Sequence, residues 1–241
     1  MVPPSAEVVP RPAATVLALR RSGSPFEVLM VRRAREASFM GGARVFPGGA
    51  VDAADSGPLA ASVVRWSGDN EERPWRAAAM RELAEEVGIF IGAPTTHMAG
   101  SSGGDIYRTL ADASVVLDGE SLVYVGNWVT PRRLPKRFDT RFYIVEVPPD
   151  TVARSDRIEV FDPIWVTPAD ALAAADDGTW QVEMPTRANL EVLARASDLD
   201  DALRTARNTT PVRTEPRLVM DAAGAWSVLL PGDPGFAEAE S

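Results

Sequence analysis

The chain has 241 residues, enough for one large domain or for one domain with added segments. It contains no cysteine, which excludes disulfides, cysteine-zinc sites and a cysteine nucleophile. Its formal net charge of −9 argues against a nucleic-acid backbone as the main partner. An anionic small molecule would instead need local help, from a metal ion and a few well-placed arginines or lysines.

The hydropathy pattern is that of an ordinary soluble protein. Hydrophobic residues make up 45% of the chain, and no apolar run reaches the length of about 18 residues that suggests a membrane span. The N-terminal segment Met1–Ser5 lacks the charged and apolar regions of a secretory signal. We therefore expect a cytoplasmic protein that has no membrane partner.

The N-terminal part predicts a disordered segment over residues 1–12, followed by a single domain over 13–241. Residues 13–19 and 26–31 are apolar and predict two buried strands. The sequence Ser-Gly-Ser-Pro at 22–25 is typical of a hairpin turn between them.

Four arginines then precede a pair of glycines. They are Arg32, Arg33, Arg35 and Arg44. Arginine offers paired donors to phosphate oxygens, so these side chains are candidates for binding a phosphate. Alternatively, they are loop residues that are exposed to solvent and bind no ligand.

The glycine pair follows a proline at Phe46–Gly49, and Asp55 stands six positions after Gly49. Two glycines allow a tight turn and a close approach of the backbone to a ligand. The segment 56–75, which carries Trp66 and Trp75, predicts either a surface excursion that packs its own tryptophans or a lid over a substrate.

Residues 74–87 predict a helix. Met80, Leu83 and Val87 form an apolar stripe at helical spacing. Pro74 suits the first helical turn, and Gly88 suits the position just after the last turn.

This helix places three carboxylates, Glu82, Glu85 and Glu86, on one face. Arg81 stands four residues before Glu85 and is predicted to pair with it. The remaining charge favours a cation, and oxygen ligands crowded on one face suit Mg²⁺ or Mn²⁺. The alternative is a solvated acidic helix face.

Residues 89–91 predict a strand, and 105–113 predict a short peripheral helix. His97, the only histidine, lies between them and is interpreted as a loop residue without a catalytic role. Strands are predicted over 122–129 and 138–147. The loop between these strands is rich in arginine, lysine and proline. It could bind the negatively charged end of a nucleotide, or it could be a turn exposed to solvent.

The C-terminal third predicts a strand over 158–166 and a helix over 168–175. A longer C-terminal helix is expected over 186–206, and a tail over 207–241. Within the tail, residues 216–230 predict a two-stranded ribbon.

Together the glycine pair and the acidic helix resemble the Nudix box, G-x5-E-x7-R-E-U-x-E-E-x-G-U, where U is a bulky aliphatic residue. Gly49 is the first glycine, and Arg81–Ile89 matches the second half at every fixed position. Asp55 stands where the first glutamate is expected, and Glu72 is an alternative replacement. The arginine is expected at 63 but stands at 81, which implies an insertion of 18 residues inside the box.

The segment before the box resembles the coenzyme A diphosphatase signature R-[S/A]-x3-R-x3-G-x3-F-P-G-G. Arg33-Ala34, Gly42 and Phe46–Gly49 fall on its spacing, but Ser38 replaces its second arginine. The runs Trp-Val-Thr-Pro at 128–131 and Arg-Phe-Asp-Thr-Arg-Phe at 137–142 resemble those of the Nudix branch with an insertion inside the box, which includes peroxisomal coenzyme A diphosphatases.

The resemblance implies an α/β protein, a Nudix-type α/β/α sandwich around a mixed β-sheet, with an insertion between the two halves of the box. It implies a pyrophosphohydrolase that cleaves the diphosphate linkage of a nucleoside diphosphate derivative. Coenzyme A or an acyl-coenzyme A is the first expectation, and NADH or ADP-ribose is the alternative. A non-catalytic Nudix-fold protein that senses a nucleotide is a third reading. Homodimers are frequent in the family.

The resemblance also implies roles for individual residues. Mg²⁺ or Mn²⁺ would be held by Glu82, Glu85, Glu86 and Glu159, the last six residues before Trp165. The catalytic set comprises Arg81, Glu82 and Glu85, with Glu82 as a further metal ligand or as the base. The residues assigned to substrate binding are Arg33, Arg35, Arg44, Gly48, Gly49 and Arg137.

Overall fold

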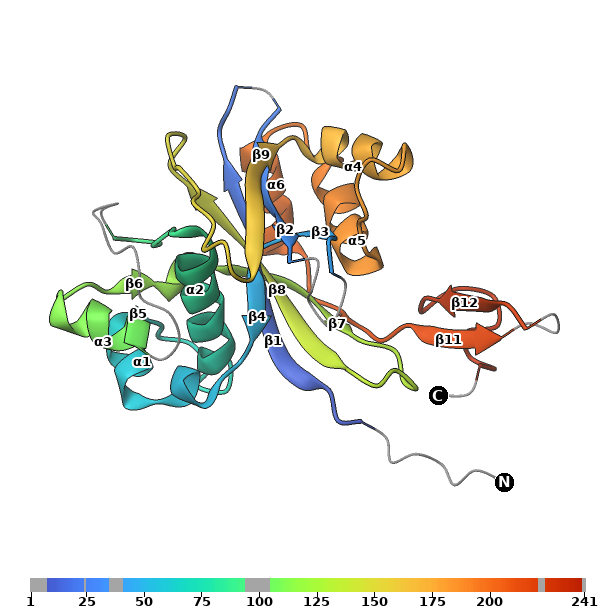
Figure 1. The fold of residues 1–241 in the computed structure, drawn as a ribbon, viewed down its shortest axis with the longest axis horizontal. Helices are drawn as coiled ribbons and strands as arrows, with labels where there is room; N and C mark the ends of the chain where they lie inside the picture. Colours follow the sequence, from blue (N-terminus) through green and yellow to red (C-terminus); the bar gives the residue numbers. More distant parts are fainter. Residues whose placement is uncertain (1–7, 24, 35–40, 94–104, 221–223, 240–241) are drawn as a thin grey trace.

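A computed structural model describes residues 8–23, 25–34, 41–93, 105–220 and 224–239. Its centre is an eight-stranded mixed sheet (Figure 1). The strands are β1 (Arg11–Arg20), β2 (Glu27–Arg33), β3 (Arg44–Val45), β4 (Gly48–Ala50), β7 (Val123–Val129), β8 (Phe138–Val147), β9 (Val160–Val166) and β10 (Arg213–Thr214).

Strand β1 is the axis of this sheet. Along its whole length it pairs in parallel with β8, from Arg11 opposite Phe138 to Arg20 opposite Val147. Its other edge is shared between β4 and β2, both antiparallel to it. The sheet order is β10-β7-β8-β1-β2-β3, with β9 on β2 and β4 on β1.

Helices cover both faces of the sheet (Figure 1). One layer contains α1 (Pro58–Val63), α2 (Arg73–Val87) and α3 (Asp105–Asp112), and the other contains α4 (Pro168–Asp176), α5 (Met184–Leu193) and α6 (Leu199–Asn208). The short elements are η1 (Ala53–Ser56), β5 (Val64–Arg65), β6 (Leu117–Asp118) and η2 (Gly119–Ser121). The predicted α/β/α sandwich around a mixed sheet is confirmed.

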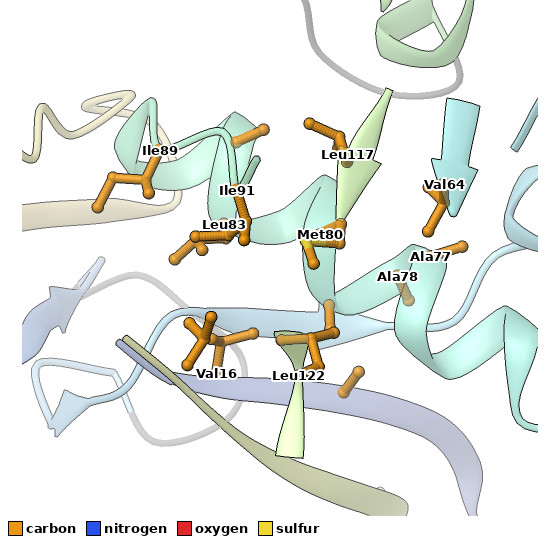
Figure 2. Close-up of a cluster of buried hydrophobic side chains, with 14 of the residues drawn as sticks. Val16, Val64, Ala77, Ala78, Met80, Leu83, Ile89, Ile91, Leu117 and Leu122 are labelled. Atoms are coloured by element: carbon orange, nitrogen blue, oxygen red, sulfur yellow. The ribbon is translucent and has the colours of Figure 1, made fainter. Parts of the chain in front are cut away.

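The two-residue period of the strands builds one hydrophobic core on each side. On β1, Ala14, Val16 and Ala18 belong to the core under α2. Leu17 and Leu19 belong to the core under α5 and α6. Figure 2 shows the first core, in which Met80 and Leu83 of α2 lie among buried side chains of neighbouring segments.

The chain ends in a ribbon of β11 (Arg217–Met220) and β12 (Trp226–Leu229), antiparallel to each other. The ribbon was predicted over 216–230. Figure 1 shows it projecting from the layered body. None of the helices formed by the described residues is long and apolar enough to cross a membrane.

Four local expectations need correction. The first two concern the N-terminus and the segment after α2. Of residues 1–12, expected to be disordered, Arg11 and Pro12 already belong to β1 because they pair with β8; residues 1–7 lie outside the described part. Residues 89–91 form no strand. Ile89 and Ile91 are instead buried in the core under α2, so their apolar character reflects packing.

The other two corrections concern helices. The helix expected over 186–206 is two helices, α5 and α6, because Asp198 has an extended backbone and caps α6 by accepting from the Asp201 N–H. The helix α3 is not peripheral. Its Ile106, Tyr107 and Leu110 are buried in the core under α2.

Candidate active site

Helix α2 carries the acidic residues. Pro74 lies in its first turn, and Gly88 ends it with φ of 68°, a left-handed conformation that suits glycine. The Gly88 N–H donates to the Ala84 carbonyl. The predicted helix over 74–87 is confirmed, and its buried side fixes the direction in which Glu82, Glu85 and Glu86 point.

Arg81 is the centre of a buried network, with 3% of its surface exposed. Its Nη1 donates to Glu82 at 2.8 Å and to Glu85 at 3.1 Å. Its Nη2 donates to the Ala50 carbonyl at 2.9 Å. The predicted pairing of Arg81 with Glu85 is confirmed, and the same guanidinium also ties α2 to β4.

Asp55 is completely buried and accepts further hydrogen bonds from the Arg81 guanidinium. It accepts from Arg81 Nε at 2.9 Å and from Nη2 at 3.0 Å. Glu72 lies elsewhere, 3.4 Å from the Arg76 guanidinium. Asp55, and not Glu72, therefore forms the buried ion pair with the arginine of the box.

Tyr107 is a residue of this network that the sequence analysis missed. Its hydroxyl donates to Asp55 Oδ1 at 2.5 Å, and its ring is buried. The available signal was the apolar spacing of Ile106, Tyr107 and Leu110, which marks the buried side of α3. That pattern predicts burial but not the partner of the hydroxyl.

The two glycines are required by close contacts inside the protein. Gly48 has φ of 154°, and a Cβ there would collide with backbone atoms of Ala14 and Thr15. A Cβ on Gly49 would collide with the Glu82 carboxylate. The Gly48 N–H also donates to Glu86 at 2.9 Å. The glycines thus let β4 pass close to β1 and to the acidic face of α2.

Glu159 comes from a different part of the chain, immediately before β9. The Asp156 carboxylate accepts from the N–H groups of Ile158, Glu159 and Val160 at 3.0–3.2 Å. The Asp156 N–H in turn donates to the Glu86 carbonyl at 3.0 Å. Asp156, which the sequence analysis did not single out, therefore holds the turn that carries Glu159 beside the end of α2.

Burial raises the pKa of two of these acids. It raises the pKa of Glu82 to about 7, although the Arg81 charge acts in the opposite direction. Burial raises the pKa of Glu86 well above its usual value, and the Glu82 charge adds to the effect. Glu159 raises the pKa of both groups through its charge. A cation at this place would favour the ionised forms.

A cavity of about 670 Å³ opens onto the acidic face. Its polar wall is formed by Arg33, Gly48, Gly49, Arg81, Glu82, Glu85, Glu86 and Glu159. Its apolar lining includes Val45, Phe46, Trp128, Leu134, Phe138, Phe142 and Met184. The cavity therefore combines a group of charged side chains with many apolar ones.

Of the described arginines in the upstream group, Arg33 lines this cavity. Its Nε is buried and has no hydrogen-bond partner among the residues that the structure describes. Its charge lowers the pKa of Glu86. A buried donor without a partner is costly, and an anionic ligand would satisfy it.

Other predicted binding residues do not line the cavity. Arg44 donates to the Asp162 carbonyl and lies over the Trp180 ring, 5.0 Å from its centroid. Arg137 is buried, and it donates to the Thr130 and Val8 carbonyls and to Glu215. Arg35 and His97 lie outside the described residues.

The segment 56–75 lines no part of the cavity. It forms α1, β5 and the loop to α2, and Ala60, Val63 and Val64 are buried in the core under α2. Trp66 lies over the Arg76 guanidinium, 3.5 Å from the ring centroid. The segment therefore packs into the core under α2 and against Arg76, and is not a surface excursion that packs only its own tryptophans.

The chemistry of the donor set fits a hard divalent cation. Four glutamates, Glu82, Glu85, Glu86 and Glu159, face one cavity, and carboxylate oxygens are the ligands that Mg²⁺ and Mn²⁺ prefer. Among the described residues, however, no group of three or more acidic, histidine or cysteine side chains is arranged so that it could hold a metal ion by itself. Mg²⁺ usually keeps several waters and shares oxygens with a substrate phosphate, so it needs fewer protein ligands than a site formed by protein alone.

Comparisons with known proteins agree on the family. The family model for the NUDIX domain matches residues 9–185. "Putative nudix hydrolase 7" of Caenorhabditis elegans is 27% identical over 201 residues, which cover 78% of this chain and 63% of that protein. The chain thus spans less than two thirds of the length of that relative.

Two further comparisons extend this similarity. "Acyl-coenzyme A diphosphatase NUDT19" of Gallus gallus is 26% identical, over 91% of this chain and 76% of that protein. The crystal structure of a NUDIX hydrolase from Alicyclobacillus acidocaldarius superposes with a TM-score of 0.70 at 29% identity. That match covers 82% of this chain and 97% of the other.

Proposed function

The chain belongs to the Nudix family of hydrolases, and from this premise we propose that it cleaves the diphosphate linkage of coenzyme A or an acyl-coenzyme A in a metal-dependent reaction. One observation carries the proposal. Four glutamates and Arg33, whose buried Nε has no hydrogen-bond partner among the described residues, line a cavity of about 670 Å³ that also has many apolar lining residues. A diphosphate with a long, weakly polar arm matches that distribution.

The four glutamates, Glu82, Glu85, Glu86 and Glu159, are the residues that would hold Mg²⁺ or Mn²⁺. When bound, such ions neutralise a diphosphate and supply a water that is nucleophilic near neutral pH. Nudix hydrolases generally use divalent metals of this kind.

The remaining polar residues position the groups that react. Arg81 fixes the side chains of Glu82 and Glu85 through its hydrogen bonds and is itself fixed by Asp55. Its role is therefore positioning more than contact with the substrate. Arg33 would donate to a phosphate oxygen and balance charge that develops on the leaving phosphate.

The choice of coenzyme A has three supports. The segment 33–49 resembles the coenzyme A diphosphatase signature, and the chain is similar over most of its length to a protein named as an acyl-coenzyme A diphosphatase. The cavity also offers Trp128, Phe138 and Met184 as an apolar lining for a pantetheine or acyl arm.

Product analysis by mass spectrometry tests the proposal. The purified protein is incubated with coenzyme A, NADH or ADP-ribose, each with Mg²⁺, Mn²⁺ or a chelator. We expect adenosine 3′,5′-bisphosphate and 4′-phosphopantetheine from coenzyme A, with formation abolished by the chelator.

Other outcomes assign other functions. AMP from NADH or ADP-ribose, with coenzyme A intact, would retain diphosphate hydrolysis and reject the coenzyme A assignment. No turnover of any substrate, together with retained binding, would favour a nucleotide sensor.

A further inference from the structure

A second cavity lies where the C-terminal ribbon meets the loop between β7 and β8. We call it the ribbon pocket, and its volume is about 260 Å³. It is lined by Arg132, Arg133, Arg213, Glu215, Pro216, Arg217, Leu218, Pro231 and Phe236. The fold places these residues together from segments about 80 to 100 positions apart in the sequence.

The lining is strongly basic in an otherwise acidic protein. Four arginines and a single carboxylate give it a net charge of +3, whereas the whole chain carries −9. A concave surface that concentrates one sign of charge raises the local concentration of ions of the opposite sign. The ribbon pocket is therefore suited to an anion.

The single carboxylate is shared among several arginines. Glu215 lies 3.4 Å from Arg132, 3.0 Å from Arg213 and 2.7 Å from the buried Arg137. Burial alone would raise the pKa of Glu215, but the hydrogen bond and charge of Arg213, with the charges of Arg132 and Arg137, lower it. Glu215 thus holds three guanidinium groups close together, and Arg213 also lies 3.8 Å from Asp139.

Arg217 is held by different contacts. Its guanidinium lies over the Phe236 ring, 4.4 Å from the centroid, and donates to the carbonyls of Phe236 and Ala239. These partners are neutral and orient the guanidinium, and no carboxylate of the described residues pairs with it. Arg133 adjoins it with φ of 73°, an uncommon backbone conformation for a residue other than glycine.

The ribbon pocket adjoins the main cavity. Pro216 and Leu218 line both. In the loop between β7 and β8, Thr130, Pro131 and Leu134 line the main cavity, whereas Arg132 and Arg133 line the ribbon pocket. A single elongated ligand can therefore lie against the glutamates with one end and reach the arginines with the other.

We propose that the ribbon pocket binds a phosphate monoester at the end of the substrate remote from the scissile diphosphate. This inference rests on the proposed function, because in coenzyme A that group is the 3′-phosphate of the ribose. Arginine matches it chemically, since guanidinium groups donate paired hydrogen bonds to phosphate oxygens. The C-terminal ribbon is then a specificity element, and its arginines separate 3′-phosphorylated substrates from those without this phosphate.

Calorimetry with two products tests the pocket without requiring turnover. Adenosine 3′,5′-bisphosphate and AMP differ only in the 3′-phosphate. We expect the wild-type protein to bind the bisphosphate at least tenfold more tightly, because a hydrogen bond to a charged group contributes about 1.5–3 kcal/mol. In the double variant Arg132→Gln/Arg213→Gln that preference is lost, whereas the affinity for AMP is unchanged.

Two further variants isolate the charge. Arg132→Lys/Arg213→Lys keeps both positive charges and is expected to retain part of the preference. Arg65→Gln/Arg204→Gln is the matched control, because Arg65 and Arg204 are each 64% exposed and each pairs with one aspartate, and neither lines either cavity. It is expected to bind both nucleotides like the wild type.

Equal binding of the two nucleotides by the wild-type protein would overturn the proposal. So would a double variant that loses affinity for both nucleotides in equal measure. Turnover of coenzyme A and of 3′-dephospho-coenzyme A is measured in parallel. If neither is hydrolysed while the bisphosphate preference and its loss are observed, the proposed function fails and the ribbon pocket stands.

Discussion

The two adjoining cavities use arginine in opposite ways. At the glutamate end, which is the main cavity, Arg81 is buried, and its hydrogen bonds run to Asp55, Glu82, Glu85 and a backbone carbonyl. At the ribbon end, which is the ribbon pocket, the side chains of Arg132 and Arg213 are 44% and 54% exposed; both lie near Glu215, and Arg213 also lies 3.8 Å from Asp139.

The difference in burial means that the two groups of arginines should differ in how strongly the protein depends on each ion pair. A buried pair that loses one partner leaves an uncompensated charge, which typically costs 3–5 kcal/mol. Exposed pairs typically contribute at most about 1 kcal/mol and are screened by salt. The glutamate end should therefore tolerate almost no change, whereas the ribbon end can vary with the substrate.

The largest expected effect is that of Glu85→Gln on turnover. Loss of a metal-binding carboxylate should lower kcat by on the order of 10³-fold or more. The matched control is Glu191→Gln, because Glu191 also pairs with an arginine four residues away at 3.1 Å but is exposed on α5. Steady-state kinetics with Mn²⁺ measure both. Near-normal turnover by Glu85→Gln would refute the assignment of the glutamate end.

The next effect is on stability. Asp55→Asn removes the charge that faces the buried Arg81 guanidinium, and we expect a loss of about 3 kcal/mol in the free energy of unfolding. Asp52→Asn is the control, because Asp52 is exposed and lies 3.9 Å from Arg11. Urea denaturation followed by circular dichroism measures the loss. Equal stability of the two variants would mean that the buried and exposed pairs do not differ as argued.

A smaller effect is expected from Tyr107→Phe. The ring stays in the core, but Asp55 loses the hydroxyl that donates to it. We expect the free energy of unfolding to fall by roughly 1 kcal/mol, the usual contribution of one hydrogen bond. Because Asp55 keeps both bonds to Arg81, turnover should change less than stability. A loss of turnover as large as that of Glu85→Gln would give Tyr107 a role beyond support.

The smallest effect concerns salt. Raising the ionic strength from about 0.01 to 0.15 M shortens the screening length from about 30 to 8 Å. The preference for the 3′-phosphate should weaken several-fold over this range, because the ribbon arginines are exposed. The free energy of unfolding that Asp55 contributes should hardly change. Parallel titrations and denaturation curves at both salt concentrations compare the two ends directly.

Local sequence patterns predicted the elements with strong periodicity. Helix α2, the strands β1, β2, β7, β8 and β9, and the ribbon all lie close to their expected positions. The misassigned segments lacked such a signal. The apolar residues at 89–91 pack without pairing, and the capping side chain of Asp198 divides what reads as one continuous helix.

The candidate site was predictable where its residues belong to one helix. The spacing of Arg81 and Glu85 suffices to predict their contact. The contact of Tyr107 with Asp55 depends on how α3 packs against α2, which no local pattern encodes. For the same reason Arg44 and Arg137 were assigned to substrate binding, although their side chains are engaged by other parts of the protein. The catalytic and metal-binding roles remain predictions.

The pairing of β1 with β8 also sets the order in which the protein can form. At roughly 5–20 residues per second, a ribosome needs on the order of ten seconds to add the 127 residues from the end of β1 to the end of β8. During that time β1 can form a hairpin with β2, but its other edge has no strand to pair with. The nascent chain therefore carries β1 with one edge unpaired during this time, and we expect protection of that edge to raise the yield of native protein.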